Sequence, residues 1–244
     1  MATLNPAQIA ILQSDIWFSG LPGPVRAAII AAAQLKQLSD GEYSHRKDRP
    51  GDGWMGILSG AIKICATAPD GKQTALAFLE PGTWFGEISL FDGLPRTHDG
   101  IAHGPTELLL VPNHEFRELL KQFPELPLHF LKLQASRLRL LFAAMEDVNV
   151  LPLPARLAKQ LVNLSHAYGV KEEDGVRINL HLPQEDLAQL LGSSRQRVNV
   201  LLSDWVRQGW VSVRYGGVTL HDEVPLKRIA AGEAAPVAAV ATTY

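Results

Sequence analysis

The sequence has little cysteine and no long apolar run. Its single cysteine, Cys65, excludes an internal disulfide, a cysteine-based zinc site and a cysteine-ligated iron–sulfur cluster. No apolar stretch approaches the roughly 18 residues that a membrane-spanning helix needs. The first 14 residues lack the basic and apolar segments of a signal peptide. We therefore expect a cytoplasmic protein without a membrane partner.

Catalytic patterns are missing as well. There is no Gly-x-Ser-x-Gly motif, no P-loop and no Ser-His-Asp spacing. The histidines at 45, 98, 103 and 114 form no His-x-His or His-x-x-x-His pair of the kind that holds a metal ion. We expect no catalytic residue, no metal site and no required cofactor. A haem held by one histidine stays open.

The composition is that of an ordinary globular chain. The 244 residues are 46% hydrophobic and 20% charged, enough for one large or two ordinary domains. A net charge of −2 argues against a uniformly basic surface, although a local basic face remains compatible with it.

Four regions follow one another along the chain. Residues up to about 35 are patterned as helix, and residues 36–111 hold short apolar runs separated by turn signals, which predicts a small antiparallel barrel or roll. Asp70-Gly71 between two such runs predicts a hairpin. Residues 112–150 return to helical spacing until Pro152 and Pro154 end the helix at an expected domain boundary.

The long helix carries two rows of apolar residues at seven-residue spacing. They predict either a coiled-coil seam to a second copy or a face that packs on its own domain. The seam residues would be Leu131, Leu138, Leu141, Met145 and Val148.

The C-terminal region has the pattern of a winged helix-turn-helix. A helix to about 168 precedes a strand over 176–180, a short helix over 184–191, and a second helix from Ser193-Ser194 to about 208. Two strands joined at 215–217 form the wing. Residues 232–244 are Ala-rich, and we expect a flexible tail there.

The helix that follows Ser194 is the predicted DNA reader. Val198, Leu201, Leu202 and Trp205 share the core-facing stripe, so other side chains face the solvent. Early positions of such a helix meet base edges, while nearby cations meet phosphates. The candidate DNA-binding residues are Ser193, Ser194, Arg195, Gln196, Arg197, Asn199, Val200 and Arg214.

A second site lies in the stretch from Phe85 to Thr97. The carboxylate of Glu87 can accept a bond from a ribose hydroxyl, and the guanidinium of Arg96 suits phosphate oxygens. Gly86 lets a backbone approach closely. The alternative is an internal ion pair between Glu87 and Arg96.

These two halves together resemble the Crp/Fnr family of bacterial transcription regulators from about residue 15 to 221. The resemblance is carried by Ile57-Leu58-Ser59-Gly60, Pro81-Gly82, Phe85-Gly86-Glu87, Leu94-Pro95-Arg96-Thr97 and Leu191-Gly192-Ser193-Ser194-Arg195, among others. It implies an α+β fold: a cyclic-nucleotide-binding-type β-roll over 1–123, a dimerisation helix over 124–151, a winged helix-turn-helix over 152–231, and the tail.

The resemblance also implies a function. We expect a homodimeric, ligand-responsive regulator of double-stranded DNA, with RNA polymerase as a candidate partner. A cyclic nucleotide, cyclic AMP first, would contact Gly86, Glu87, Ile88, Arg96 and Thr97, and its base could stack on Phe142.

Three features depart from the family's cyclic-AMP receptor pattern. His98-Asp99 replaces a small residue after the Arg-Thr pair, and Leu141 and Phe142 replace hydroxyl residues that face adenine. Gln196 and Val200 change the reader helix, so we expect a different operator. A regulator that binds DNA constitutively, or that senses another nucleotide or a haem-bound gas, is the alternative.

Overall fold

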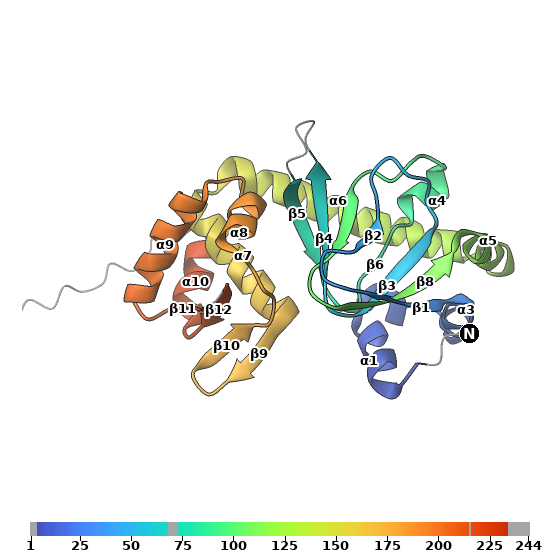
Figure 1. Ribbon diagram of the computed structural model, residues 1–244, viewed down its shortest axis with the longest axis horizontal. Helices are drawn as coiled ribbons and strands as arrows, with labels where there is room; N and C mark the ends of the chain where they lie inside the picture. Colours follow the sequence, from blue (N-terminus) through green and yellow to red (C-terminus); the bar gives the residue numbers. More distant parts are fainter. Residues whose placement is uncertain (1–3, 68–72, 215, 234–244) are drawn as a thin grey trace, which may run out of the picture. The chain divides into compact units, whose positions relative to one another are not determined.

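The computed structural model describes residues 4–67, 73–214 and 216–233 (Figure 1). The chain divides into two compact units, Met1–Leu140 and Leu141–Tyr244, so the division falls inside the long helix. The expected end of the β-roll domain at residue 123 and the expected end of the dimerisation helix at residue 151 stay predictions. Within the described part of the chain, no helix combines the length and apolar character that crossing a membrane requires.

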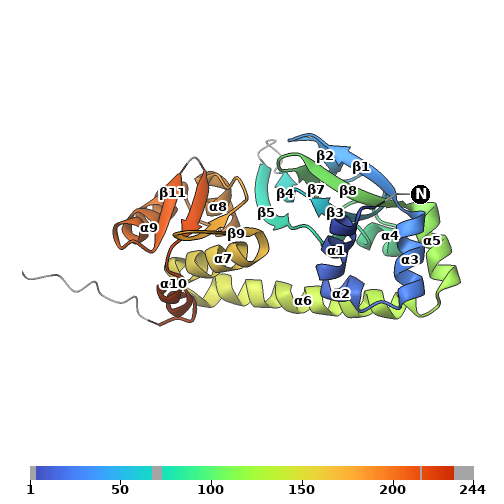
Figure 2. The ribbon, with the colours of Figure 1, turned by 90° about the horizontal axis from the view of Figure 1, so that it is seen from below.

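Three short helices open the N-terminal unit: α1 (Pro6–Ser14), α2 (Ile16–Ser19) and α3 (Gly23–Ala32). Asn5 and Gln8 close a capping box at the start of α1, and the Asp15 side chain accepts the Phe18 amide to begin α2. The Trp17 indole donates to the carbonyl of His129 at 2.7 Å, which ties α2 to the long helix α6 (Leu126–Val150), seen as one unbroken helix in Figure 2.

Two four-stranded antiparallel sheets form the predicted roll. One has the order β1-β8-β3-β6 and the other the order β2-β7-β4-β5. Their strands are β1 (Gln34–Leu38), β2 (Tyr43–His45), β3 (Gly53–Ser59), β4 (Ile62–Thr67), β5 (Gln73–Leu79), β6 (Trp84–Phe85), β7 (Asp99–Ala102) and β8 (Thr106–Pro112). Strands β4 and β5 pair as expected, although the predicted turn at Asp70-Gly71 lies outside the described residues.

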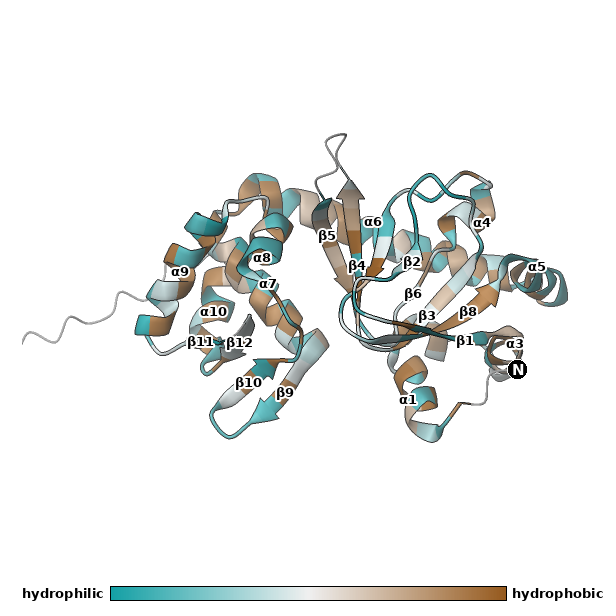
Figure 3. Cartoon of the chain, viewed as in Figure 1, coloured by the Kyte–Doolittle hydropathy of each residue, from teal (hydrophilic) through white to brown (hydrophobic). Residues whose placement is uncertain are grey.

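The core of this unit is built around stacked aromatic rings. Trp54 and Trp84 stack with ring centroids 4.2 Å apart, and Phe130 of α6 packs edge-on against Trp54. Strand β8 is largely apolar, whereas helix α5 (Asn113–Gln122) is mostly polar (Figure 3). Because Trp84 lies two residues before Gly86, this buried cluster fixes the start of the ligand-type motif.

The predicted seam residues of α6 lie in solvent in the single chain. Their exposed fractions range from 52% to 65%, so the described residues of the chain leave more than half of each side chain uncovered. Exposed large apolar side chains on a helix are typical of a surface that a partner covers. The exposed residues are Leu131, Leu138, Leu141, Met145 and Val148.

The C-terminal unit is the predicted winged helix-turn-helix with two additions. Its elements are α7 (Leu153–Tyr168), β9 (Gly169–Glu172), β10 (Gly175–Ile178), α8 (Gln184–Leu190), α9 (Arg195–Arg207), β11 (Val211–Arg214), β12 (Gly217–Leu220) and α10 (Glu223–Ala230). Strand β9 and helix α10 were not predicted, and the strand expected over 176–180 is β10, ending at Ile178. The wing turn at Tyr215 and the tail beyond 233 lie outside the described residues.

Candidate functional site

A cavity of about 440 Å³ opens in the roll beside β6 and the short helix α4 (Ile88–Asp92). This volume is in the range of small-ligand pockets. Part of its wall is apolar, formed by Ile64, Leu79, Phe85 and Leu140. Five of the six predicted ligand residues line it: Gly86, Glu87, Ile88, Arg96 and Thr97.

Glu87 is an almost completely buried carboxylate, 1% exposed. Its Oε1 accepts from the Gln134 amide at 2.6 Å and forms an ion pair with Arg137 of α6. These bonds offset the cost of burying the charge. Among the described residues, no donor reaches its second oxygen, Oε2.

Arg96, 3% exposed, is held by a different set of partners. Its Nη2 donates to the Asp52 carboxylate at 2.8 Å and to the Gly53 carbonyl at 2.6 Å, and its Nη1 donates to the Gly86 carbonyl at 2.5 Å. The Nε–H has no acceptor in the described part of the chain. The alternative of a Glu87–Arg96 ion pair is therefore wrong, because each charge has its own partner.

Gly86 makes room for that guanidinium. Its φ of +94° lies in the left-handed region, and a Cβ at this position would lie 2.7 Å from Arg96 Nη1. The group that comes close to Gly86 in this structure is a side chain of the protein itself, and a close approach to a ligand stays a prediction.

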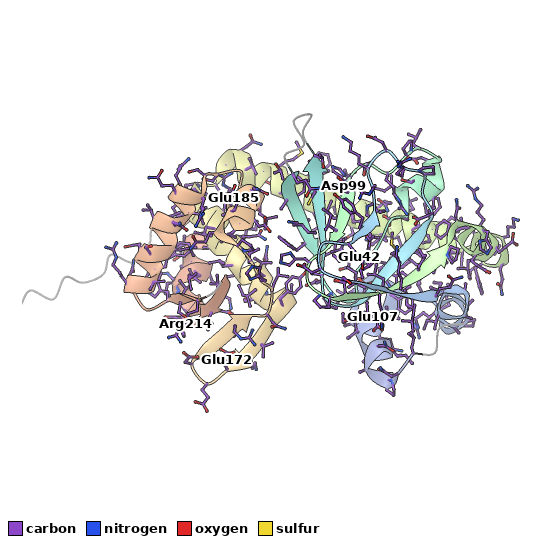
Figure 4. All side chains as sticks on the ribbon, in the orientation of Figure 1. Glu42, Asp99, Glu107, Glu172, Glu185 and Arg214 are labelled. Atoms are coloured by element: carbon purple, nitrogen blue, oxygen red, sulfur yellow. The ribbon has the colours of Figure 1, made fainter. Side chains whose placement is uncertain are left out.

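Two histidines border the charged end of the cavity. Burial, with the nearby Arg96 charge, lowers the pKa of His45 to about 4, so this imidazole is neutral at physiological pH. His98 lies beside Thr97, with Nδ1 and Oγ1 3.0 Å apart. Asp99, labelled in Figure 4, is not among the lining residues. Its carboxylate accepts from the Lys47 amide and the Thr67 hydroxyl.

Phe142 is not part of the described cavity lining. Its side chain is 61% exposed, and stacking on a base stays a prediction. The residues that sequence reasoning missed are Arg137 and Gln134, which reach Glu87 from a position about fifty residues later in the chain. The sequence has no local signal for these two contacts, because each joins residues about fifty positions apart.

Metal ligands are not gathered anywhere in the described ranges. Among the residues that the structure describes, no group of three or more His, Cys, Asp or Glu side chains is positioned to hold an ion.

The second site is the outer face of α9. The Ser194 side chain caps the helix by accepting the Arg197 amide at 3.4 Å. Val198, Leu202 and Trp205 are buried, and Leu201 is half-buried. The opposite stripe forms one hollow on the surface, lined by Arg195, Gln196, Asn199, Val200, Ser203 and Arg207.

The remaining predicted DNA residues do not line this hollow, and they differ in exposure. Arg197 is exposed, and Arg214 is exposed at the end of β11, where Figure 4 labels it. Ser193 is half-buried, and its hydroxyl has no partner among the described residues. Four of the eight predicted residues line the hollow itself, and the other two lining residues, Ser203 and Arg207, are not among the eight.

Known proteins match both halves of the chain. Residues 35–123 match the model of the cyclic nucleotide-binding domain, and residues 155–229 match the Crp-like helix-turn-helix domain. A CRP-like cAMP-activated global transcriptional regulator of Mycobacterium tuberculosis is 32% identical over 211 residues, covering 86% of this chain and 94% of the relative.

Two further similarities cover less of the chain or are structural. A global nitrogen regulator of Synechocystis is 30% identical over 70% of this chain and 77% of its own length. The crystal structure of a CRP/FNR-family transcriptional regulator from Thermus thermophilus superposes with a TM-score of 0.65. It is 27% identical and covers 81% of this chain and 98% of that one.

Proposed function

The chain belongs to the Crp/Fnr family of transcription regulators, and from this premise we propose that it is a homodimer whose DNA binding responds to a cyclic nucleotide in the roll. Cyclic AMP is the first candidate effector, as in the name of the mycobacterial relative. The regulator would act in the cytoplasm, with RNA polymerase as a further candidate partner.

The observation that carries this proposal is a pair of unused polar atoms in one cavity. Glu87 Oε2 and Arg96 Nε are both buried without a partner among the described residues, although their remaining polar atoms are bonded. An orphaned acceptor and an orphaned donor are costly to bury unless a ligand uses them. A ribose hydroxyl would satisfy the first, and a phosphate oxygen would satisfy the second.

The same residues connect the cavity to the long helix. Glu87 is bonded to Gln134 and Arg137, and Arg137 also donates to the Trp84 carbonyl. A sugar that binds Glu87 therefore competes with, or adds to, the contacts that hold α6. Only a ligand that favours one arrangement of α6 can shift the regulator between states.

We propose that two copies meet along α6. The row of Leu131, Leu138 and Met145 gives each helix an apolar stripe that the described residues of its own chain leave more than half exposed. A parallel pairing would bury this row against itself. The two α9 helices would then read two half-sites about 34 Å apart on the DNA.

Calorimetry on the full-length protein tests the ligand. We expect cyclic AMP, cyclic GMP or cyclic di-GMP to give a saturable heat with the wild type. Thr97→Val should weaken that binding about tenfold, because a hydroxyl that bonds a charged phosphate is worth roughly 1.5 kcal/mol. Glu87→Gln, which keeps the side-chain volume, should remove most of the heat.

The control is Thr74→Val on β5, a residue outside the cavity lining, which should bind as the wild type does. An absence of heat with all three nucleotides on folded wild-type protein would exclude them as effectors.

The second candidate is a regulator that binds DNA without a nucleotide or senses another effector. It is favoured by the apolar wall formed by Ile64, Leu79 and Leu140, which offers no side-chain hydrogen bond to a base. Full DNA affinity without ligand would support constitutive binding, and a Soret band in the visible spectrum would indicate haem.

A further inference from the structure

The hollow on the outer face of α9 is lined by one apolar side chain, Val200, whose exposure the packing of the helix does not explain. Val200 is 65% exposed, whereas the core row of the same helix is buried. A β-branched residue in a helix interior loses rotamer freedom, and here it gains no burial in return. Its immediate surroundings are polar: Gln196 is four residues before it, and Ser203 is three residues after it on the same stripe.

The rest of the hollow indicates what covers it. Arg195 and Arg207 place cations towards its two ends, and Gln196 and Asn199 present amides between them. The Asn199 side-chain oxygen is buried and has no donor among the described residues. Cations that flank hydrogen-bonding amides are suited to phosphates and base edges, and the only large apolar group on a major-groove base edge is the thymine methyl.

We propose that Val200 contacts the C5 methyl group of a thymine, which makes it a specificity-determining residue of the operator half-site. This inference rests on the proposed DNA-binding function of α9. Val200 lies about 6 Å along the helix axis from Gln196, because each residue rises 1.5 Å. Base pairs are stacked about 3.4 Å apart. The thymine therefore lies within about two base pairs of the adenine that the Gln196 amide suits.

The test removes the methyl group from the DNA. Selection from a random duplex library, with full-length protein and with or without cyclic AMP, first gives the half-site. Each selected thymine is then replaced by deoxyuridine, one position at a time, and the dissociation constant is measured by fluorescence anisotropy at fixed salt. Deoxyuridine pairs as thymine does but lacks the methyl.

We expect one thymine per half-site at which the replacement weakens binding about fourfold, the value of one buried methylene-sized group. In Val200→Ala this difference should disappear, so that both duplexes bind alike. The control is Val206→Ala on the same helix. Val206 is 42% exposed and does not line the hollow, so its variant should keep the fourfold difference.

The outcomes separate the assignment of Val200 from the DNA-binding function on which it rests. A half-site without a methyl-sensitive thymine, or a sensitivity that persists in Val200→Ala, overturns the assignment of Val200 while leaving DNA binding intact. A selection that enriches no sequence under either condition overturns the DNA-binding function itself, and the assignment falls with it.

Discussion

Glu87 and Arg96 each have hydrogen bonds within the protein and one buried polar atom without a partner among the described residues. Both were predicted as ligand-binding residues from the local motif at 85–97, because the carboxylate, the guanidinium and the glycine all lie within thirteen positions. Arg137 was not predicted, because only the packing of α6 against β6 brings it to Glu87. A contact that spans fifty residues has no local sequence signal.

Gly86 offers a direct test of this packing. Gly86→Ala should lower the free energy of unfolding of the N-terminal unit by about 2–4 kcal/mol, because it adds left-handed strain and a collision with Arg96. At Gly93, whose φ is +72°, a Cβ would have no described atom within 4 Å, so Gly93→Ala should lower the free energy of unfolding by only about 1–2 kcal/mol. Urea titration measures both, and equal losses would contradict the role given to Gly86.

His45 predicts a pH dependence. Its pKa is lowered from 6.5 to about 4 in the folded protein, so between these values the unfolded chain binds more protons. The free energy of unfolding should therefore fall with decreasing pH, by about 2 kcal/mol between pH 7 and pH 5. His45→Asn should remove this part of the slope.

Burial raises the pKa of Asp15 and of Glu80, and their contribution to the pH dependence has the opposite sign. Because both carboxylates remain in His45→Asn, the difference between the two proteins isolates the histidine. Identical pH profiles in urea would show that His45 is not held in its neutral form.

Secondary-structure elements with a capping residue and a regular apolar pattern were predicted from the sequence, whereas short elements without such signals were missed. Helix α9 has a serine cap and a regular apolar stripe, and it begins where expected. Strand β9 is four exposed residues that gain their structure from pairing with β10, and α10 carries Pro225 in its first turn. Neither has a periodic pattern long enough to predict it.

The long helix carries the proposed dimer contact. Leu138→Glu should convert the dimer to a monomer, because it would place two carboxylates in an apolar seam. Arg139→Glu puts the same residue at the neighbouring exposed position, off the seam, and should leave the dimer intact. Sedimentation velocity distinguishes the two, and a Leu138→Glu protein that remains dimeric would move the interface away from this row.

A ligand in the roll cavity can regulate DNA binding by α9 only if the two sites of the molecule are coupled. The cavity contacts α6 through Gln134 and Arg137, and α6 continues to Val150, directly before α7 of the DNA-binding unit. A ligand that changes the contacts of Glu87 therefore acts on the element that connects the units in sequence. Allosteric coupling of this kind changes affinity about 5- to 150-fold.

The most direct test is the affinity of the full-length protein for its selected operator, measured by fluorescence anisotropy at fixed salt with and without saturating cyclic AMP. We predict that the nucleotide tightens binding at least about fivefold and that Glu87→Gln loses this response. Equal affinity in both conditions, with the nucleotide shown by calorimetry to occupy the roll, would contradict a ligand-responsive regulator.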